Sequence, residues 1–265
     1  MSALVSCRGL EVGYRGRAIL PPIDLELPRG KMMLILGRNG SGKSSLIKTM
    51  LGLQPPIAGA IEWAPRVRRA YVPQSGAIDL AVPVRAADVA GWGRLRGWSF
   101  LSPLPKREDR RHRDEALAAL GVAELGRRRL RDLSGGQVQR VLFARMLAGE
   151  TDVAVLDEPT AAMDAAGERA VYGTLRRLAR ERGIAVVVVT HAVSAALGAC
   201  DEVLLLDPDT APGGADTRDD RAIAKAAGRV VTGTPAQVAE DPTFHALFGV
   251  GARPDALEAE AARAS

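Results

Sequence analysis

The segment GRNGSGKSS, which begins at Gly37, carries glycines, a lysine and serines in the spacing G-x-x-x-x-G-K-[ST]. A compact apolar run, KMMLILG, leads into it, and GKSSLIKTMLGL after it has helical periodicity. Glycines let successive backbone N–H groups turn inward around phosphates, and the start of a helix adds its dipole. The segment therefore predicts a phosphate-binding loop between a strand and a helix.

The polar side chains of this loop have separate tasks. We expect Lys43 to reach the β and γ oxygens of a nucleoside triphosphate and the Ser44 hydroxyl to bind magnesium. The ligands expected here are ATP and Mg²⁺. The residues expected to surround the phosphates are Gly37, Arg38, Asn39, Gly40, Ser41, Gly42, Lys43, Ser44 and Ser45.

Two adjacent carboxylates, Asp157 and Glu158, close the apolar run VAVLDEP, where a strand is predicted to end. At the carboxyl edge of a parallel sheet they would lie beside the phosphates. Neighbouring side chains cannot point the same way, so we expect Asp157 to hold Mg²⁺ and Glu158 to polarise the attacking water as general base. The alternative interpretation, a solvated acidic turn, is disfavoured because the chain also carries the phosphate-binding loop.

Two further polar residues follow predicted strands. His191 comes after VVVVT and is expected to contact the γ-phosphate and order the water, while His112 and His245 are expected to be solvated or packed. Gln74 follows YVP and leads into a helical block. Its amide is expected to reach the magnesium or the water and to report nucleotide occupancy to that block.

A second glycine-rich turn, LSGGQ, precedes another predicted helix. Ser134 suits the N-cap, and Gly135 and Gly136 permit close backbone approach, which makes a second anion site. Within one chain this site would be redundant, because the loop at Gly37 already surrounds the triphosphate. We therefore expect two chains, head to tail about a two-fold axis, with two ATP molecules between them. The alternative is a helix start without a ligand.

The predicted elements place these residues in an α/β fold. β-type runs extend to about residue 83, helices fill about 84–148, and strands alternate with helices over about 149–250. Alternating apolar strands and helices predict a parallel sheet covered on both faces. We expect one domain over 1–265. It would comprise an α/β core built on this parallel sheet, an antiparallel β subdomain and an inserted α-helical subdomain. The composition of residues 208–228 predicts a flexible insertion, and residues 251–265 are expected to form a frayed C-terminal tail.

Composition narrows the class of protein. The chain has 265 residues, 47% of them hydrophobic, which suits one large domain with a real core. Two cysteines are too few for a disulfide framework and are expected as buried free thiols. No apolar run approaches the roughly 20 residues of a membrane span, and no signal peptide begins the chain. The net charge is +5, and much of the excess of basic residues is concentrated in a few basic runs. Such runs are typical of a solvated helical face or of a surface that faces phospholipid headgroups.

In their order and spacing these motifs resemble those of the ATP-binding subunits of ABC transporters, over roughly Leu4 to Gly249. The matching segments are GRNGSGKS (Walker A), VPQ with Gln74 (Q-loop), LSGGQ (signature), VAVLDEP (Walker B), TAAMD with Asp164 (D-loop) and TH with His191 (switch histidine). The resemblance implies a P-loop NTPase (RecA-like) core, ATP-driven dimer closure and an adenine stacked on Tyr14. The second set of nucleotide contacts would come from Ser134, Gly135, Gly136, Gln137 and Asp164.

The resemblance also implies partners and a location. A single nucleotide-binding unit without a membrane span implies a separate transmembrane permease, an extracytoplasmic solute-binding protein, and a peripheral position on the cytoplasmic face of the inner membrane. The stretch RRAYVPQSGAIDLAVPVRAADVAGWGR is similar to the subfamily that serves zinc and manganese importers. The iron-siderophore and cobalamin subfamily, which shares the GR dipeptide, remains the alternative.

Two other classes fit less well. Nucleic-acid-handling members of the superfamily carry coiled-coil insertions or two such units in tandem, and this chain has neither, so we expect no nucleic-acid partner. A non-hydrolysing regulatory module would lack Glu158 or His191, and both are present. We therefore expect a working ATPase.

Overall fold

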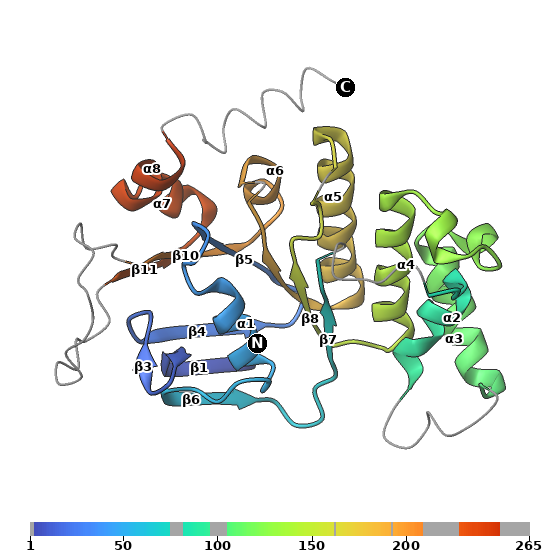
Figure 1. Ribbon diagram of the computed structural model, residues 1–265, viewed down its shortest axis with the longest axis horizontal. Helices are drawn as coiled ribbons and strands as arrows, with labels where there is room; N and C mark the ends of the chain where they lie inside the picture. Colours follow the sequence, from blue (N-terminus) through green and yellow to red (C-terminus); the bar gives the residue numbers. More distant parts are fainter. Residues whose placement is uncertain are drawn as a thin grey trace.

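The computed structural model describes residues 3–74, 82–95, 105–161, 163–191, 193–208 and 228–249, and a six-stranded sheet forms its centre (Figure 1). The strands follow the order β11-β10-β5-β9-β8-β7. Their bounds are Met32–Gly37 (β5), Arg69–Val72 (β7), Val153–Asp157 (β8), Ala185–Val189 (β9), Glu202–Pro208 (β10) and Gly228–Gly233 (β11).

The sheet is parallel from β10 to β7, and β11 runs antiparallel to β10. Parallel strands present their carboxyl ends at one edge, which is where ligands bind in sheets of this type. The residues at and just after the ends of β5, β7, β8 and β9 are therefore brought to a common edge. They are the loop after Gly37, Gln74, the pair Asp157 and Glu158, and His191.

A smaller antiparallel sheet packs on one face of the central sheet. Its order is β4-β1-β6, and together with helix α1 it shares a core with Met33 and Ile35 of β5. The bounds are Ala3–Glu11 (β1), Ile23–Pro28 (β4), Ala58–Trp63 (β6) and Lys43–Met50 (α1), with a short hairpin of Gly13–Tyr14 (β2) and Arg17–Ala18 (β3).

Helices cover the opposite face, where Met32, Leu34 and Leu36 of β5 join a second core. Helices α5 (Ala165–Arg182), α6 (Val193–Leu197) and α7 (Pro235–Glu240) follow β8, β9 and β11, and α8 (Pro242–Phe248) follows α7. The two faces of β5 thus serve two different cores, as a strand in a sheet covered on both sides must.

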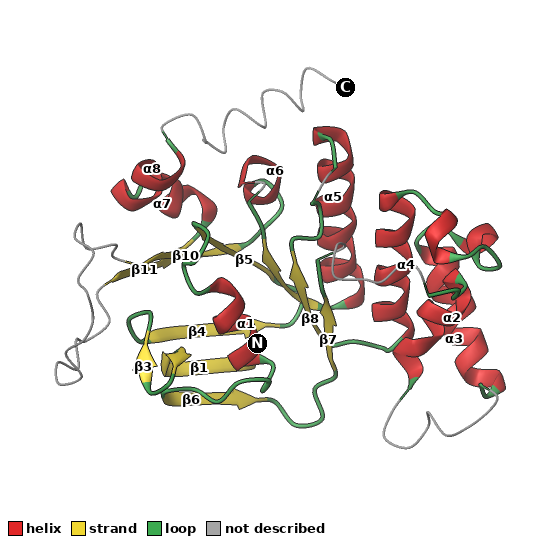
Figure 2. Cartoon of the chain, viewed as in Figure 1, coloured by secondary structure: helices red, strands yellow, loops and turns green. Residues whose placement is uncertain are grey.

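A block of helices lies beside β7, at one end of the central sheet (Figure 2). Its elements are α2 (Ala86–Gly91), η2 (Trp92–Arg94), α3 (Arg107–Ala119), η4 (Ala123–Leu125), η5 (Leu130–Asp132) and α4 (Gly135–Ala148). The parallel sheet, the antiparallel β unit and the inserted helices confirm the fold class expected from the sequence.

Several expected segments lie at or beyond the limits of the described residues. Only the ends of the predicted insertion 208–228 are described, and there Pro208 of β10 pairs with Gly228 of β11. The tail 251–265 lies outside the described residues. Both cysteines are buried, as expected, and burial raises the pKa of each thiol to about 12. Within the described ranges, no helix is long and apolar enough to cross a membrane.

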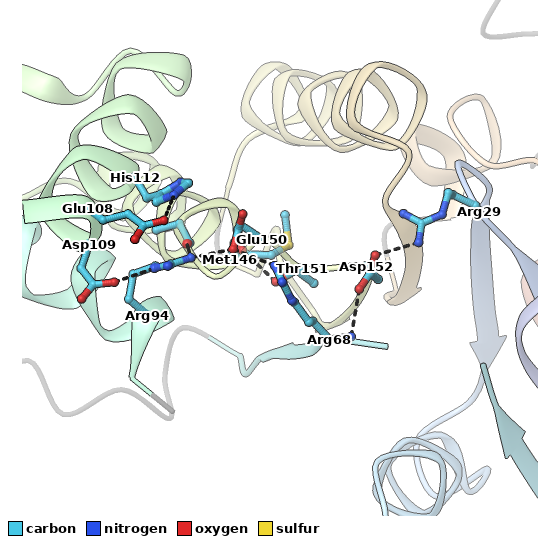
Figure 3. A network of polar contacts seen from close by, with 11 residues as sticks. Arg29, Arg68, Arg94, Glu108, Asp109, His112, Met146, Glu150, Thr151 and Asp152 are labelled. Carbon is cyan, nitrogen blue, oxygen red and sulfur yellow. Dashed lines mark hydrogen bonds and ion pairs between the residues drawn. The ribbon is translucent and has the colours of Figure 1, made fainter. Parts of the chain in front are cut away.

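A network of ion pairs joins the helical block to the central sheet (Figure 3). Arg94, at the end of η2, contacts Asp109 of α3 at 2.9 Å and Glu150 at 2.7 Å. Glu150, in the turn between α4 and β8, also accepts from Arg68 at 2.7 Å, just before β7. Because the Arg94 side chain is only 13% exposed, this bridge is better shielded from solvent than an ordinary surface pair.

The network makes a prediction about stability at acid pH. Hydrogen bonds from Arg94 hold the pKa of Asp109 and of Glu150 below their ordinary values. A carboxyl whose folded-state pKa is depressed stabilises the fold above its unfolded-state pKa, about 4, and loses that contribution as the pH falls further. Arg94→Met should lower the free energy of unfolding by about 1 kcal/mol at pH 7, and by less at pH 3.

Urea unfolding at the two pH values measures the effect. Arg111→Met is the matched control, because Arg111 and Glu115 form a pair in which both side chains are more than half exposed. This control should change the stability by only a few tenths of a kcal/mol. An equal loss in both variants would contradict a special role of the Arg94 bridge.

Candidate active site

The loop after β5 has a backbone that glycine makes possible. Gly40 and Gly42 have φ angles of 82° and 91°, in the left-handed region that other residues rarely adopt. A Cβ on Gly37 would lie 2.4 Å from Ser41 Oγ and 2.5 Å from the carbonyl oxygen of Leu206. Gly42 is the N-cap of α1 and provides no side-chain cap, so the first N–H groups of α1 remain available to an anion.

Lys43 begins α1 and folds back over the loop. Its Nζ donates to the carbonyl oxygens of Gly37 at 2.7 Å and Arg38 at 2.8 Å, and its side chain is buried. Burial lowers the pKa of Lys43, while the charges of Glu158 and Asp157 act in the opposite direction. The ammonium group therefore lies in a partly desolvated site with carboxylates nearby, where its charge acts strongly.

Glu158 is the centre of the polar contacts at the sheet edge. Its Oε1 lies 2.7 Å from His191 Nε2, and its Oε2 accepts from Gln74 Nε2 at 3.5 Å. Its backbone N–H donates to the carbonyl of Val189, and its φ angle of 48° is uncommon for a residue other than glycine. Such backbone strain is typical of functional positions. Three residues predicted separately, Glu158, His191 and Gln74, are thus in contact.

A cleft of about 290 Å³ opens beside these groups. It is lined by Tyr14, Ile19, the loop residues 39–45, Asp157, Glu158, Val189 and His191. Tyr14 is half exposed, and its hydroxyl is hydrogen-bonded to that of Ser45, so its ring lies at the cleft beside the phosphate loop. The phosphate loop, the carboxylate pair, the histidine and the aromatic ring that the sequence predicted therefore line one cavity.

The second glycine-rich turn does not line this cleft. Ser134 Oγ accepts from the N–H of Gln137, and Gln137 Oε1 accepts from the N–H of Ser134, so the two residues form a capping box on α4. Among the described residues, nothing lies within 4 Å of a Cβ built on Gly135 or Gly136. The packing of this chain therefore does not itself require glycine at either position.

Three other polar residues have structural neighbours of their own. Asp164 is the N-cap of α5 and accepts from the N–H of Gly167 at 2.7 Å. His112 of α3 lies 3.6 Å from Glu108, and His245 of α8 packs edge-on against Phe244. Neither of these histidines lines the cleft.

Tyr71 is a neighbour of the site that the sequence analysis did not identify. Its hydroxyl donates to Asp157 Oδ2 at 3.3 Å, and burial together with the charge of Asp157 raises the pKa of Tyr71. The tyrosine lies three residues before Gln74, but only the order of the strands brings β7 beside β8. No local signal in the sequence indicates that contact.

The oxygen groups at the cleft fit a magnesium ion. The Ser44 hydroxyl and the Asp157 carboxylate belong to the same cavity, and the Gln74 amide lies beside Glu158. Hydroxyl, carboxylate and amide oxygens are the hard ligands that Mg²⁺ takes, usually together with substrate phosphates. The phosphate loop supplies the place for those phosphates.

Comparison with known proteins identifies the family. The sequence model of the ABC transporter family matches residues 20–161, more than half of the chain. The chain belongs to the ABC transporter family and is an ATPase of the ABC type, whose hydrolysis of ATP is coupled to transport.

Two curated relatives cover most of the chain. The zinc import ATP-binding protein ZnuC of Ruegeria pomeroyi is 34% identical over 94% of this chain and 86% of its own length. The manganese transport system ATP-binding protein MntB of Bacillus subtilis is 40% identical over 76% of this chain and 82% of its own length.

A solved structure agrees with the fold. It is described as a metal-chelate type ABC transporter in an inward-facing conformation, and it superposes with a TM-score of 0.77 at 27% identity over 93% of this chain and 89% of its own. The cbiO1 protein of Clostridium perfringens, at 24% identity and a TM-score of 0.72, has the same fold.

The geometry of the phosphate loop predicts the effect of one methyl group. Gly37→Ala forces the new Cβ against Ser41 Oγ and the Leu206 carbonyl, so the loop must shift. ATP affinity should fall by about tenfold or more, which is about 1.4 kcal/mol. Titration with a fluorescent ATP analogue measures this.

Gly173→Ala is the matched control. Gly173 lies within α5 with open space around a Cβ, so alanine there should raise the free energy of unfolding by about 0.5–1 kcal/mol. ATP affinity should stay unchanged in this variant. Unaltered ATP binding in Gly37→Ala would show that the loop does not need glycine at this position.

Proposed function

We propose that this chain hydrolyses ATP to drive the uptake of a metal cation of the zinc or manganese type through a separate permease. The observation that supports the solute class is the agreement of relatives over nearly the whole chain, since those relatives are named as zinc import and manganese transport ATP-binding proteins. The cleft supports the ATPase part, because it gathers a phosphate loop, two carboxylates and a histidine.

In this proposal the polar side chains in and beside the cleft have separate roles in hydrolysis. Lys43 binds the β- and γ-phosphates, and Ser44, Asp157 and Gln74 hold Mg²⁺. Magnesium, when bound, neutralises charge on the phosphate oxygens. Glu158 accepts a proton from the attacking water, and the 2.7 Å contact with His191 keeps the carboxylate in place.

A dimer would complete the site. The LSGGQ turn presents a capped helix start and two glycines whose missing side chains leave open space on this chain. Glycine at such a place lets a second molecule approach the backbone closely. We infer that Ser134, Gly135, Gly136 and Gln137 of one chain contact the γ-phosphate of ATP held by another, with Asp164 near the same interface.

A groove between β7 and the helical block is the surface proposed for the permease. It measures about 570 Å³ and runs beside Pro73, the residue before Gln74. Trp92 and Leu95 line it while 43% and 50% exposed, and the grouping of exposed apolar side chains in one groove is typical of interaction sites. An apolar helical segment of the permease would cover them, and Gln74 would relate its position to the state of the cleft.

The solved relative supports a second candidate solute. Because that structure is described as a metal-chelate type transporter, uptake of an iron–siderophore or cobalamin-like chelate by this chain remains a distinct proposal. Uptake of a free cation needs only the metal in the medium, whereas uptake of a chelate also needs the chelating molecule, so one experiment distinguishes the two solutes.

Cellular metal content tests the solute. With Lys43→Ala in metal-poor medium, zinc or manganese content should fall severalfold while iron is unchanged. Loss of iron alone, and only when a chelate is supplied, would favour the second candidate.

Trp92→Arg should also abolish uptake, although ATP hydrolysis by the isolated chain continues, because the groove lies outside the cleft.

The base assignment predicts the behaviour of Glu158→Gln. ATP binding should persist, since the phosphate loop is untouched, and turnover should fall by about 10²- to 10⁴-fold. Light scattering should then reveal a dimer with ATP, because the closed state is not released by hydrolysis. Glu115→Gln, on an exposed position of α3, is the control and should hydrolyse ATP normally. A Glu158→Gln chain that is monomeric and active would refute both assignments.

A further inference from the structure

Tyr71 contacts Asp157 as a result of strand register. It lies on β7, the edge strand of the central sheet, where it pairs with Val155 of β8. Side chains alternate along a strand, so Val155 and Asp157 point to the same side of the sheet as Tyr71. The Tyr71 hydroxyl donates to Asp157 Oδ2 at 3.3 Å. Two neighbouring strands of the core thus hold donor and acceptor together.

The bond acts on the carboxylate that is proposed to bind magnesium. Partners that hydrogen-bond to a metal ligand set its orientation, and their loss weakens metal binding even though they never touch the metal. A donor fixed to Oδ2 limits rotation of the carboxylate and leaves Oδ1 to a cation. The negative charge of Asp157 also acts on the Lys43 ammonium, where it opposes the effect of burial on the pKa of Lys43.

We propose that Tyr71 is a positioning residue for Asp157, and that its hydroxyl orients this carboxylate for magnesium at the ATP site. The proposal rests on the proposed function, since it takes Asp157 as a magnesium ligand. Tyr71 also lines the 570 Å³ groove proposed for the permease, so a residue of that groove contacts Asp157 of the cleft. The phenol is 37% exposed, and a phenylalanine ring fits the same space without the hydroxyl.

Tyr71→Phe tests the hydroxyl alone. Mn²⁺ is titrated into the full chain with the non-hydrolysable analogue AMP-PNP, and bound Mn²⁺ is measured by electron paramagnetic resonance. The Mn²⁺ affinity should be about tenfold weaker than in the unaltered protein. Binding of AMP-PNP without metal should be unchanged, because the phosphate loop keeps its contacts. A general loss of structure would weaken both.

Tyr172→Phe is the matched control for removal of a tyrosine hydroxyl. Tyr172 is buried in α5, and its hydroxyl lies 3.4 Å from Thr160 Oγ1 and is also hydrogen-bonded to Thr190. It does not line the cleft and makes no contact with Asp157 that would orient this carboxylate. Its Mn²⁺ affinity should equal that of the unaltered protein. In an Asp157→Asn background, Tyr71→Phe should cause no further loss, because its effect is exerted through Asp157.

Three results would overturn the proposal. They are an unchanged Mn²⁺ affinity in Tyr71→Phe, an equal loss in Tyr172→Phe, and a further tenfold loss in the Asp157→Asn background. Failure of the unaltered protein to bind AMP-PNP at all would instead refute the proposed function, so the two failures are distinguishable.

Discussion

The burial of β5 on both faces is the constraint on which the site depends. Met33 and Ile35 pack toward the antiparallel sheet, and Leu34 and Leu36 pack toward the helices. A slip of one residue would exchange the side chains of these two cores, so the register of the strand is strongly specified. The end of the strand at Gly37 is therefore fixed relative to β9 and β10, and with it the start of the phosphate loop.

The charges of the cleft are balanced by groups from several strands. The buried Lys43 ammonium donates hydrogen bonds to two carbonyl oxygens of its own loop. It also interacts electrostatically with the carboxylates of Glu158 and Asp157. Glu158 contacts His191, which follows β9, and accepts a hydrogen bond from Gln74, which follows β7. Buried charge is tolerated only where it is paired and hydrogen-bonded, so these contacts make the arrangement possible. They also couple Gln74, beside the groove, to the carboxylate proposed as base.

The helical block is attached to the core by packing and by a shielded polar bridge. Phe143 and Leu142 of α4 belong to the core that also contains Leu34, while Arg94 and Glu150 join η2 to the turn before β8. Apolar packing is non-directional, whereas paired arginine and carboxylate groups demand a particular geometry. The bridge thus contributes to the orientation of the groove that lies between β7 and the helices.

The sequence by itself determined the local parts of this protein. The glycine spacing after β5, the capped start of α4 at Ser134 and the apolar strands before Asp157 and His191 are encoded by neighbouring residues, because turns, caps and periodicity are short-range properties. The motif resemblance added the family and the roles of the residues. Tertiary structure alone decided the strand order, in which β9 lies between β5 and β8 although it follows both in the chain. That order results from packing between distant segments, which local signals do not record. The strand order brought His191 to Glu158 and Tyr71 to Asp157. The packing of the helical block brought Arg94 to Glu150 and left the LSGGQ turn outside the cleft.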